Sequence, residues 1–167
     1  EAGAATTVTV TGTVPLDLSG DPFNGVITSF DTSGLAGAMT VSFAGGAGVT
    51  YKGGAKIDTV TGSSNADSIT AGEGADVITP GAGADVIVLT ETTAAADTLK
   101  LTDAVSADAV TGFNVGTVDD LVSYTIGNIS YTGGNDTLST LGGTDINAAV
   151  AAGAATAAAV TATDGTV

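Results

Sequence analysis

The sequence has no cysteine, no histidine, no arginine and no tryptophan among its 167 residues. Without cysteine the chain can form no disulfide, thiolate ligand or iron–sulfur site. Without histidine it has no imidazole base for a Ser–His pair and no imidazole ligand for zinc or copper. The metal-binding groups that remain are carboxylates, hydroxyls and backbone carbonyls, which suit hard cations such as calcium.

Positive charge is also scarce. Lys52, Lys56 and Lys100 are the only cations against 18 acidic residues, so the formal net charge is −15. Such a chain cannot neutralise a phosphate backbone, and anionic lipid repels it, so we expect no nucleic-acid partner and no binding to anionic membranes. No apolar run approaches the ~20 residues of a membrane-spanning helix, so no transmembrane segment is expected.

Patterns that carry catalysis are missing too. The sequence contains no phosphate-binding glycine loop and no nucleophile elbow. With aromatic residues at 4%, a sugar would find no platform beside a pair of carboxylates. We therefore expect that the chain is not an enzyme. The apolar fraction of 43% argues against disorder, and abundant Val, Ile and Thr favour strands.

A nine-residue repeat occupies the middle of the chain. Residues 53–88 divide into four consecutive nonapeptides, which are GGAKIDTVT, GSSNADSIT, AGEGADVIT and PGAGADVIV. The sixth position of each row is an aspartate: Asp58, Asp67, Asp76 and Asp85. The eighth is a β-branched aliphatic residue: Val60, Ile69, Ile78 and Ile87. Most residues in the first five positions are small, as a tight turn requires.

Each row therefore reads as a turn followed by a strand of three or four residues, too short to be stable alone. Stacking the rows as a parallel coil gives every strand two neighbours and collects the aliphatic residues in a narrow core. Two rows make one full turn, so that each row lies above the row two further along. The predicted fold class is all-β: a parallel β-roll, or β-helix-like coil, with irregular flanking strands.

These rows resemble the glycine- and aspartate-rich repeats of RTX proteins, whose pattern is G-G-x-G-x-D-x-U-x with U a large aliphatic residue. The resemblance implies a β-roll that binds Ca²⁺ between turn loops two rows apart. The residues that it marks as metal-binding are Asp58, Asp67, Asp76, Asp85, Gly62, Gly72, Gly74, Gly81, Gly83 and Asn65. Asn65 and Lys56 replace the fourth-position glycine. Asn65 tolerates the left-handed conformation, whereas Lys56 counts against a site in its loop.

Electrostatics supports this implication. Along a full turn Asp58 stacks on Asp76, and Asp67 on Asp85, about 5 Å apart. Ionised carboxylates repel at that distance, and a divalent cation converts the repulsion into cohesion. The alternative is that the aspartates only accept hydrogen bonds from backbone amides in Asx-turns.

The flanks divide the chain further. We expect an N-terminal strand segment over 1–25, the coil over 26–122 with a capping segment at its end, and a C-terminal β and alanine-rich segment over 123–167. The alternating Thr7–Thr11 stretch is an ordinary terminal strand, an ice-binding face or an edge strand given to a neighbouring subunit. From Ile146 toward Val160 the alanine-rich run predicts a short helix, or else Ala/Thr strands.

These features favour a calcium-stabilised structural protein of a bacterial surface layer (S-layer) or similar extracellular array. Such a protein would be secreted to the cell surface and would self-assemble with calcium into a homo-oligomer, with cell-surface polysaccharide as a further expected partner. The alternative is an RTX accessory domain of a larger secreted enzyme, toxin or adhesin, which folds with calcium after type I secretion. Only about a quarter of the chain is regular repeat, which favours the first interpretation.

Overall fold

The computed structural model describes residues 6–20, 26–102 and 107–112, together with the backbone of strands at 121–124, 128–131 and 160–161. These residues form strands, turns and bends, and no helix occurs among them. The helix expected from Ile146 toward Val160 lies outside the described residues, apart from a two-residue strand at Val160–Thr161. No helix able to cross a membrane is found in the described part of the chain.

The strands form two parallel sheets. The larger sheet has the order β1-β3-β5-β7-β9-β11-β13-β14 and the smaller one the order β12-β10-β8-β6-β4-β2. The larger sheet consists of β1 (Thr7–Gly12), β3 (Ser29–Leu35), β5 (Thr50–Lys52), β7 (Ser68–Thr70), β9 (Val86–Val88), β11 (Ala107–Thr111), β13 (Asn128–Tyr131) and β14 (Val160–Thr161). The smaller consists of β2 (Leu16–Leu18), β4 (Met39–Ser42), β6 (Asp58–Thr61), β8 (Val77–Thr79), β10 (Thr98–Leu101) and β12 (Leu121–Tyr124).

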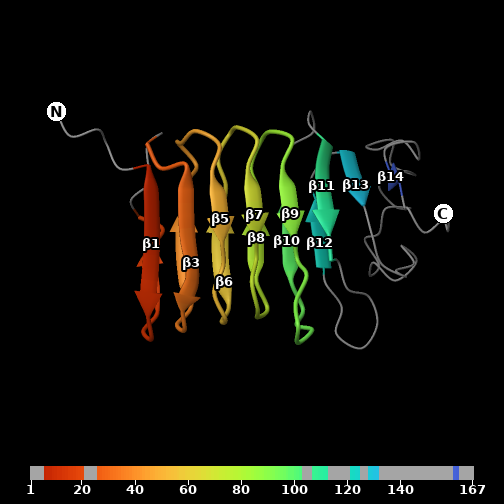
Figure 1. The fold of residues 1–167 in the computed structure, drawn as a ribbon. Helices are drawn as coiled ribbons and strands as arrows, with labels where there is room; N and C mark the ends of the chain where they lie inside the picture. Colours follow the sequence, from red (N-terminus) through yellow and green to blue (C-terminus); the bar gives the residue numbers. More distant parts are fainter. Residues whose placement is uncertain are drawn as a thin grey trace.

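From β1 to β13, consecutive strands alternate between the two sheets, and each pairs in parallel with the strand two places further along. Two strands with their loops therefore make one turn of a flattened coil, as predicted. Figure 1 shows the two sheets back to back, with one set of loops along the lower edge and the other along the upper edge. The predicted β-solenoid class is confirmed.

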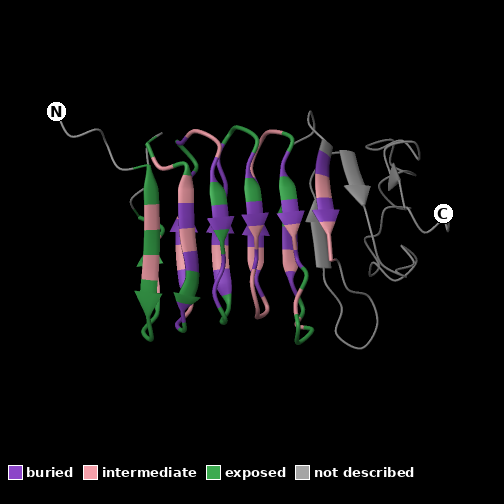
Figure 2. Cartoon of the chain, viewed as in Figure 1, coloured by how far each residue is buried: buried purple, intermediate pink, exposed green. Residues whose placement is uncertain are grey.

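The core is a thin layer of stacked side chains between the sheets. Val60 pairs with Ile78 and Ile69 with Ile87, and all four side chains are fully buried. Toward β3 the same layer widens to hold three aromatic rings. Phe30 and Phe43 lie edge to face with centroids 5.4 Å apart, and Tyr51 lies 6.3 Å from both. Burial therefore alternates along the central strands in Figure 2.

The flanking strands belong to the same coil. Residues 26–52 supply β3, β4 and β5, the irregular turns that the sequence predicts. β1 pairs with β3 alone among the described strands and exposes Thr7, Thr9 and Thr11. At the other end β13 pairs with β11. Parallel pairing thus continues through β13 at Asn128–Tyr131.

Candidate metal centre

Glycine-rich loops line both edges of the coil. Loops 53–57 and 71–75 lie on the lower edge, and loops 62–66 and 80–84 on the upper edge. Gly72, Gly74, Gly81 and Gly83 have φ angles of 108°, 123°, 102° and 121°. Residues with a Cβ rarely adopt these angles, so the second and fourth positions of these two rows require glycine.

The loops also touch their neighbours two rows away. A Cβ on Gly62 would collide with the carbonyl oxygen of Pro80, and one on Gly81 with that of Ser63. On the lower edge Gly72 lies against the carbonyl oxygen of Gly54 in the same way. The backbones of successive loops are therefore in contact, and carbonyl oxygens line the space between them.

The aspartates form one column along each edge, and the columns are joined by hydrogen bonds between turns. On the lower edge the N–H of Asp58 donates to Asp76 Oδ1 (2.7 Å), and the N–H of Asp76 donates to Asp97 Oδ1 (2.8 Å). On the upper edge the N–H of Asp67 donates to Asp85 Oδ1 (2.8 Å), and the N–H of Asp85 donates to Asp108 Oδ1 (3.0 Å). The predicted pairs, Asp58 with Asp76 and Asp67 with Asp85, are thus neighbours.

Asp58, in the first row, is satisfied by protein donors. Its Oδ1 accepts the N–H of Met39 (2.9 Å), while its Oδ2 accepts the N–H of Gly54 (2.9 Å) and the hydroxyl of Tyr51 (3.1 Å). Burial raises the pKa of Asp58, and these three donors oppose the rise. Burial likewise raises the pKa of Tyr51, so its hydroxyl keeps its proton and remains a donor.

Asp67, in the second row, is held in a similar way. Its Oδ2 accepts the N–H of Ser63 (2.6 Å), and its Oδ1 accepts the Ser63 hydroxyl (2.9 Å) and the N–H of Val49 (2.7 Å). In both rows the second residue of the loop donates its N–H to the carboxylate. This is the amide hydrogen bonding that the Asx-turn alternative describes.

Asp76, in the third row, differs from both. Its side chain is fully buried, yet among the described residues its Oδ2 has no hydrogen-bond partner. The second residue of its loop, Gly72, has a positive φ, unlike Gly54 and Ser63, and its N–H does not donate to Oδ2 of Asp76. Burial raises the pKa of Asp76 to about 8, and the charges of Asp58, Asp97 and Glu91 add to that rise. A buried carboxylate oxygen without a donor is a position that a cation would satisfy.

Asn65 does not behave as we expected. No non-glycine residue among the described ones has a positive φ, so Asn65 does not mimic glycine. Instead its amide nitrogen donates to the carbonyl oxygen of Gly46 (3.1 Å), and its own N–H donates to Ser63 Oγ (3.0 Å). Its side chain therefore ties its loop to the preceding loop on the upper edge.

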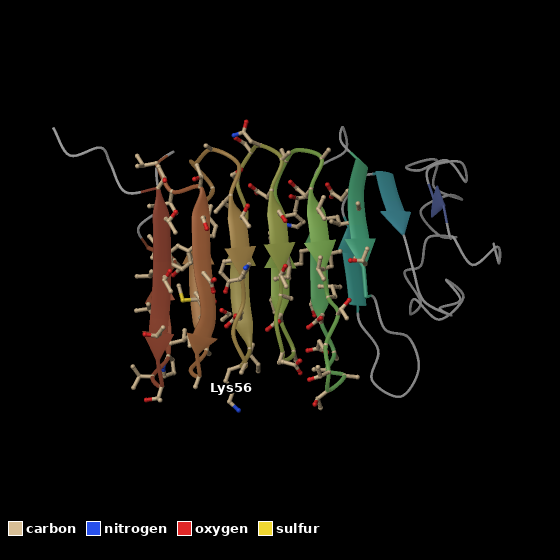
Figure 3. The ribbon with its side chains drawn as sticks, viewed as in Figure 1. Lys56 is labelled. Carbon is tan, nitrogen blue, oxygen red and sulfur yellow. The ribbon has the colours of Figure 1, made fainter. Side chains whose placement is uncertain are left out.

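Lys56 holds the corresponding place on the lower edge. A Cβ on Gly74 would touch the backbone of Lys56, so the two loops are stacked there. The Lys56 side chain is exposed and points away from the coil in Figure 3. Its ammonium group does not neutralise the buried carboxylates.

Several residues of this arrangement were not among the predicted metal ligands. Asp97 and Asp108 continue the columns at spacings of 21 and 23 residues, and their Asp-x-aliphatic signature is the signal that identifies them. Tyr51, Ser63, Glu73 and Glu91 carry no signal, since none has a fixed place in the nine-residue pattern.

The oxygen atoms of these loops suit a hard cation that is bound mainly by backbone carbonyls. Within the described ranges, no three acidic side chains gather into a metal-binding group. A calcium ion would therefore take one or two carboxylate oxygens and complete its six to eight ligands from loop carbonyls and water. Magnesium, which demands a strict octahedron, fits such adaptable loops less well.

The fold and its edges define a parallel β-solenoid with glycine-rich, aspartate-bearing loops. The family model of the RTX calcium-binding nonapeptide repeat (4 copies) matches residues 52–87. The chain thus carries an RTX-type block within a longer β-solenoid, and the resemblance of the four rows is confirmed over that block. No curated protein and no solved structure gives a significant match to the chain.

Proposed function

We propose that the chain is a calcium-stabilised structural module of an extracellular surface layer. The observation that carries the calcium part is Asp76, whose fully buried Oδ2 has no hydrogen-bond partner in the described structure. A buried charge without a partner destabilises a fold, and a divalent cation would remove that penalty. Bound calcium would supply positive charge beside the buried carboxylates, which Lys56 does not neutralise.

In this proposal the loops themselves prepare the site. Gly72 and Gly81 let the backbone of each loop touch the loop two rows earlier, which brings carbonyl oxygens of two turns together. In each aspartate column, one carboxylate oxygen accepts a hydrogen bond from a backbone N–H of the preceding turn. A cation shared between two loops would therefore crosslink successive turns and make their folding dependent on calcium.

Assembly into a layer is supported by the end of the coil. β1 has one neighbouring strand among those described, so its other edge offers backbone groups for pairing with a second copy. A net charge of −15 opposes association, and divalent ions between exposed carboxylates such as Asp17 would relieve it. Association should therefore depend on calcium.

Light scattering and negative-stain microscopy of the purified chain at rising calcium test this function. We expect a monomer in chelator and an ordered sheet or filament at millimolar calcium. A folded, calcium-saturated chain that stays strictly monomeric at high concentration would instead support the accessory-domain alternative. Absence of any calcium-binding heat in calorimetry would remove the calcium part itself.

A further inference from the structure

The loop after β9 departs from the nine-residue pattern. On the lower edge, Asp76 lies 18 residues after Asp58, whereas Asp97 lies 21 residues after Asp76. The extra three residues lengthen the loop over 89–97, which lies beyond the matched block at 52–87. This loop is the lower-edge neighbour of loop 71–75.

Two glutamates join these loops. Glu73 reaches from the first loop to the second, where its carboxylate accepts the N–H and hydroxyl of Thr92 (2.8 and 2.7 Å) and the N–H of Thr93 (3.2 Å). Glu91 reaches back, where its Oε1 accepts the N–H of Gly74 (2.8 Å) while its Oε2 accepts the N–H of Ala95 (2.6 Å). Both oxygens of Glu91 retain a lone pair after these contacts, whereas Oε1 of Glu73 already accepts two hydrogen bonds.

Of the two glutamates, Glu91 is the one whose carboxylate contacts the loop before Asp76, the aspartate whose Oδ2 has no donor. The Oδ2 atoms of Asp58 and Asp67 face the second residue of their own loops, while Oδ1 in all three rows accepts an amide of the preceding turn. By analogy, Oδ2 of Asp76 is directed at loop 71–75. Glu91 is bonded to Gly74 of that loop, two residues before Asp76. Its charge is also one of those that act on Asp76. The Glu73 carboxylate is instead occupied at Thr92 and Thr93.

We propose that loops 71–75 and 89–97 form a calcium site in which Glu91 is a side-chain ligand together with Oδ2 of Asp76. The inference rests on the proposed calcium function and deepens it, because it adds a ligand that the nonapeptide pattern does not contain. Glutamate can bind calcium through both oxygens, and the Glu91 side chain already reaches loop 71–75 at Gly74. The remaining ligands are backbone carbonyls and water.

Calcium calorimetry on the whole chain tests this site, with Glu91→Gln and Glu73→Gln as a matched pair. Each variant removes one charge and keeps one oxygen acceptor for the contact between the loops. Mutating even a residue that only orients a ligand weakens metal binding about 10–100-fold, so loss of a ligand should cost at least that much. We expect Glu91→Gln to lose about one calcium ion per chain, or to bind it at least tenfold more weakly. Glu73→Gln should keep the wild-type number and affinity.

Three outcomes would overturn the inference. The first is wild-type binding by Glu91→Gln, and the second is an equal loss in both variants, which would indicate a role in joining the loops only. If Glu91→Gln fails to fold, Glu91→Asp keeps the charge but shortens the side chain by one methylene, so it should bind the ion at least tenfold more weakly than Glu73→Gln. Binding of that ion by Glu91→Asp with wild-type affinity is the third. If the wild-type chain itself binds no calcium, the proposed function falls as well.

Discussion

The hydroxyl of Tyr51 donates to Asp58 Oδ2 over 3.1 Å, and so occupies the carboxylate oxygen that has no donor in Asp76. The two aspartates are successive members of one column, joined by the hydrogen bond from Asp58 N–H to Asp76 Oδ1. The same position of the repeat thus exists in two states. One is satisfied by protein donors, and the other is open to a cation.

Replacing Tyr51 by Phe should remove one donor from Asp58 Oδ2 and so make the first row more like the row of Asp76. The change leaves Asp58 Oδ2 with the Gly54 N–H alone and should cost about 1–3 kcal/mol of unfolding free energy, as for other buried groups that lose a partner. Denaturant unfolding in calcium measures the loss. Thr50→Val, an exposed neighbour on the same strand, is the control and should change stability little. Equal stability of Tyr51→Phe and wild type would contradict the role of this hydroxyl.

Asparagine at Asp76 and at Asp58 should have opposite effects in chelator. Asp76→Asn removes a buried acid that must either stay charged among other acidic groups or take up a proton, so the calcium-free chain should become more stable while its gain from calcium shrinks. Asp58→Asn turns an amide NH₂ group toward existing donors and should destabilise the chain in both conditions. Thermal melts followed by circular dichroism, with and without calcium, compare the two. The same sign for both variants in chelator would argue against two states of the column.

Acid should stabilise the chain in chelator. Asp76 has a pKa of about 8 in the fold against an ordinary value of 3.8, and the pKa of Asp58 is raised as well. Between those values the folded state holds a proton that the unfolded state has lost, so stability falls as the pH rises from about 4 to about 8. Unfolding in chelator at pH 5 and pH 8 should show the more stable fold at pH 5. In calcium the trend should weaken or reverse, because protons compete with the metal. A chelated chain that is more stable at pH 8 would refute this.

Alanine at Gly81 should destabilise the upper edge. Its φ is 102°, and a Cβ there would collide with the carbonyl oxygen of Ser63, so both the conformation and the contact resist substitution. We expect a loss of more than ~1 kcal/mol. Gly20→Ala is the matched control, since a Cβ at Gly20 meets no atom within 4 Å. Similar melting temperatures for the two variants would show that the loops do not need to touch.

The regular part of the fold could be predicted because its determinants repeat along the chain. The period of nine places Val60 on Ile78 and Asp58 beside Asp76 without any knowledge of the loops. The same rule, relaxed to an Asp-x-aliphatic signature, extends the columns to Asp97 and Asp108.

The chemistry of the individual rows could not be predicted in this way. Whether an aspartate is satisfied depends on which group faces its second oxygen, and that group is Tyr51 in one row and Ser63 in the next. The interpretation of Asn65 failed for the same reason. The tolerance of asparagine for a left-handed backbone is a property of one residue. It does not predict that the Asn65 side chain will donate to the carbonyl oxygen of Gly46, 19 residues away.

The hydrogen bonds between strands run along the axis of the coil, because each inner strand of a sheet pairs with the neighbouring strand on either side along that axis. A pulling force applied along that axis would therefore load the turns in series and peel them one at a time, rather than shear the whole sheet at once. Each regular turn of 18 residues would release about 60 Å of chain. A cation shared between two loops would raise the force needed to detach the turn that it binds. The coil would then lengthen under tension in discrete increments whose strength is set by the calcium around it.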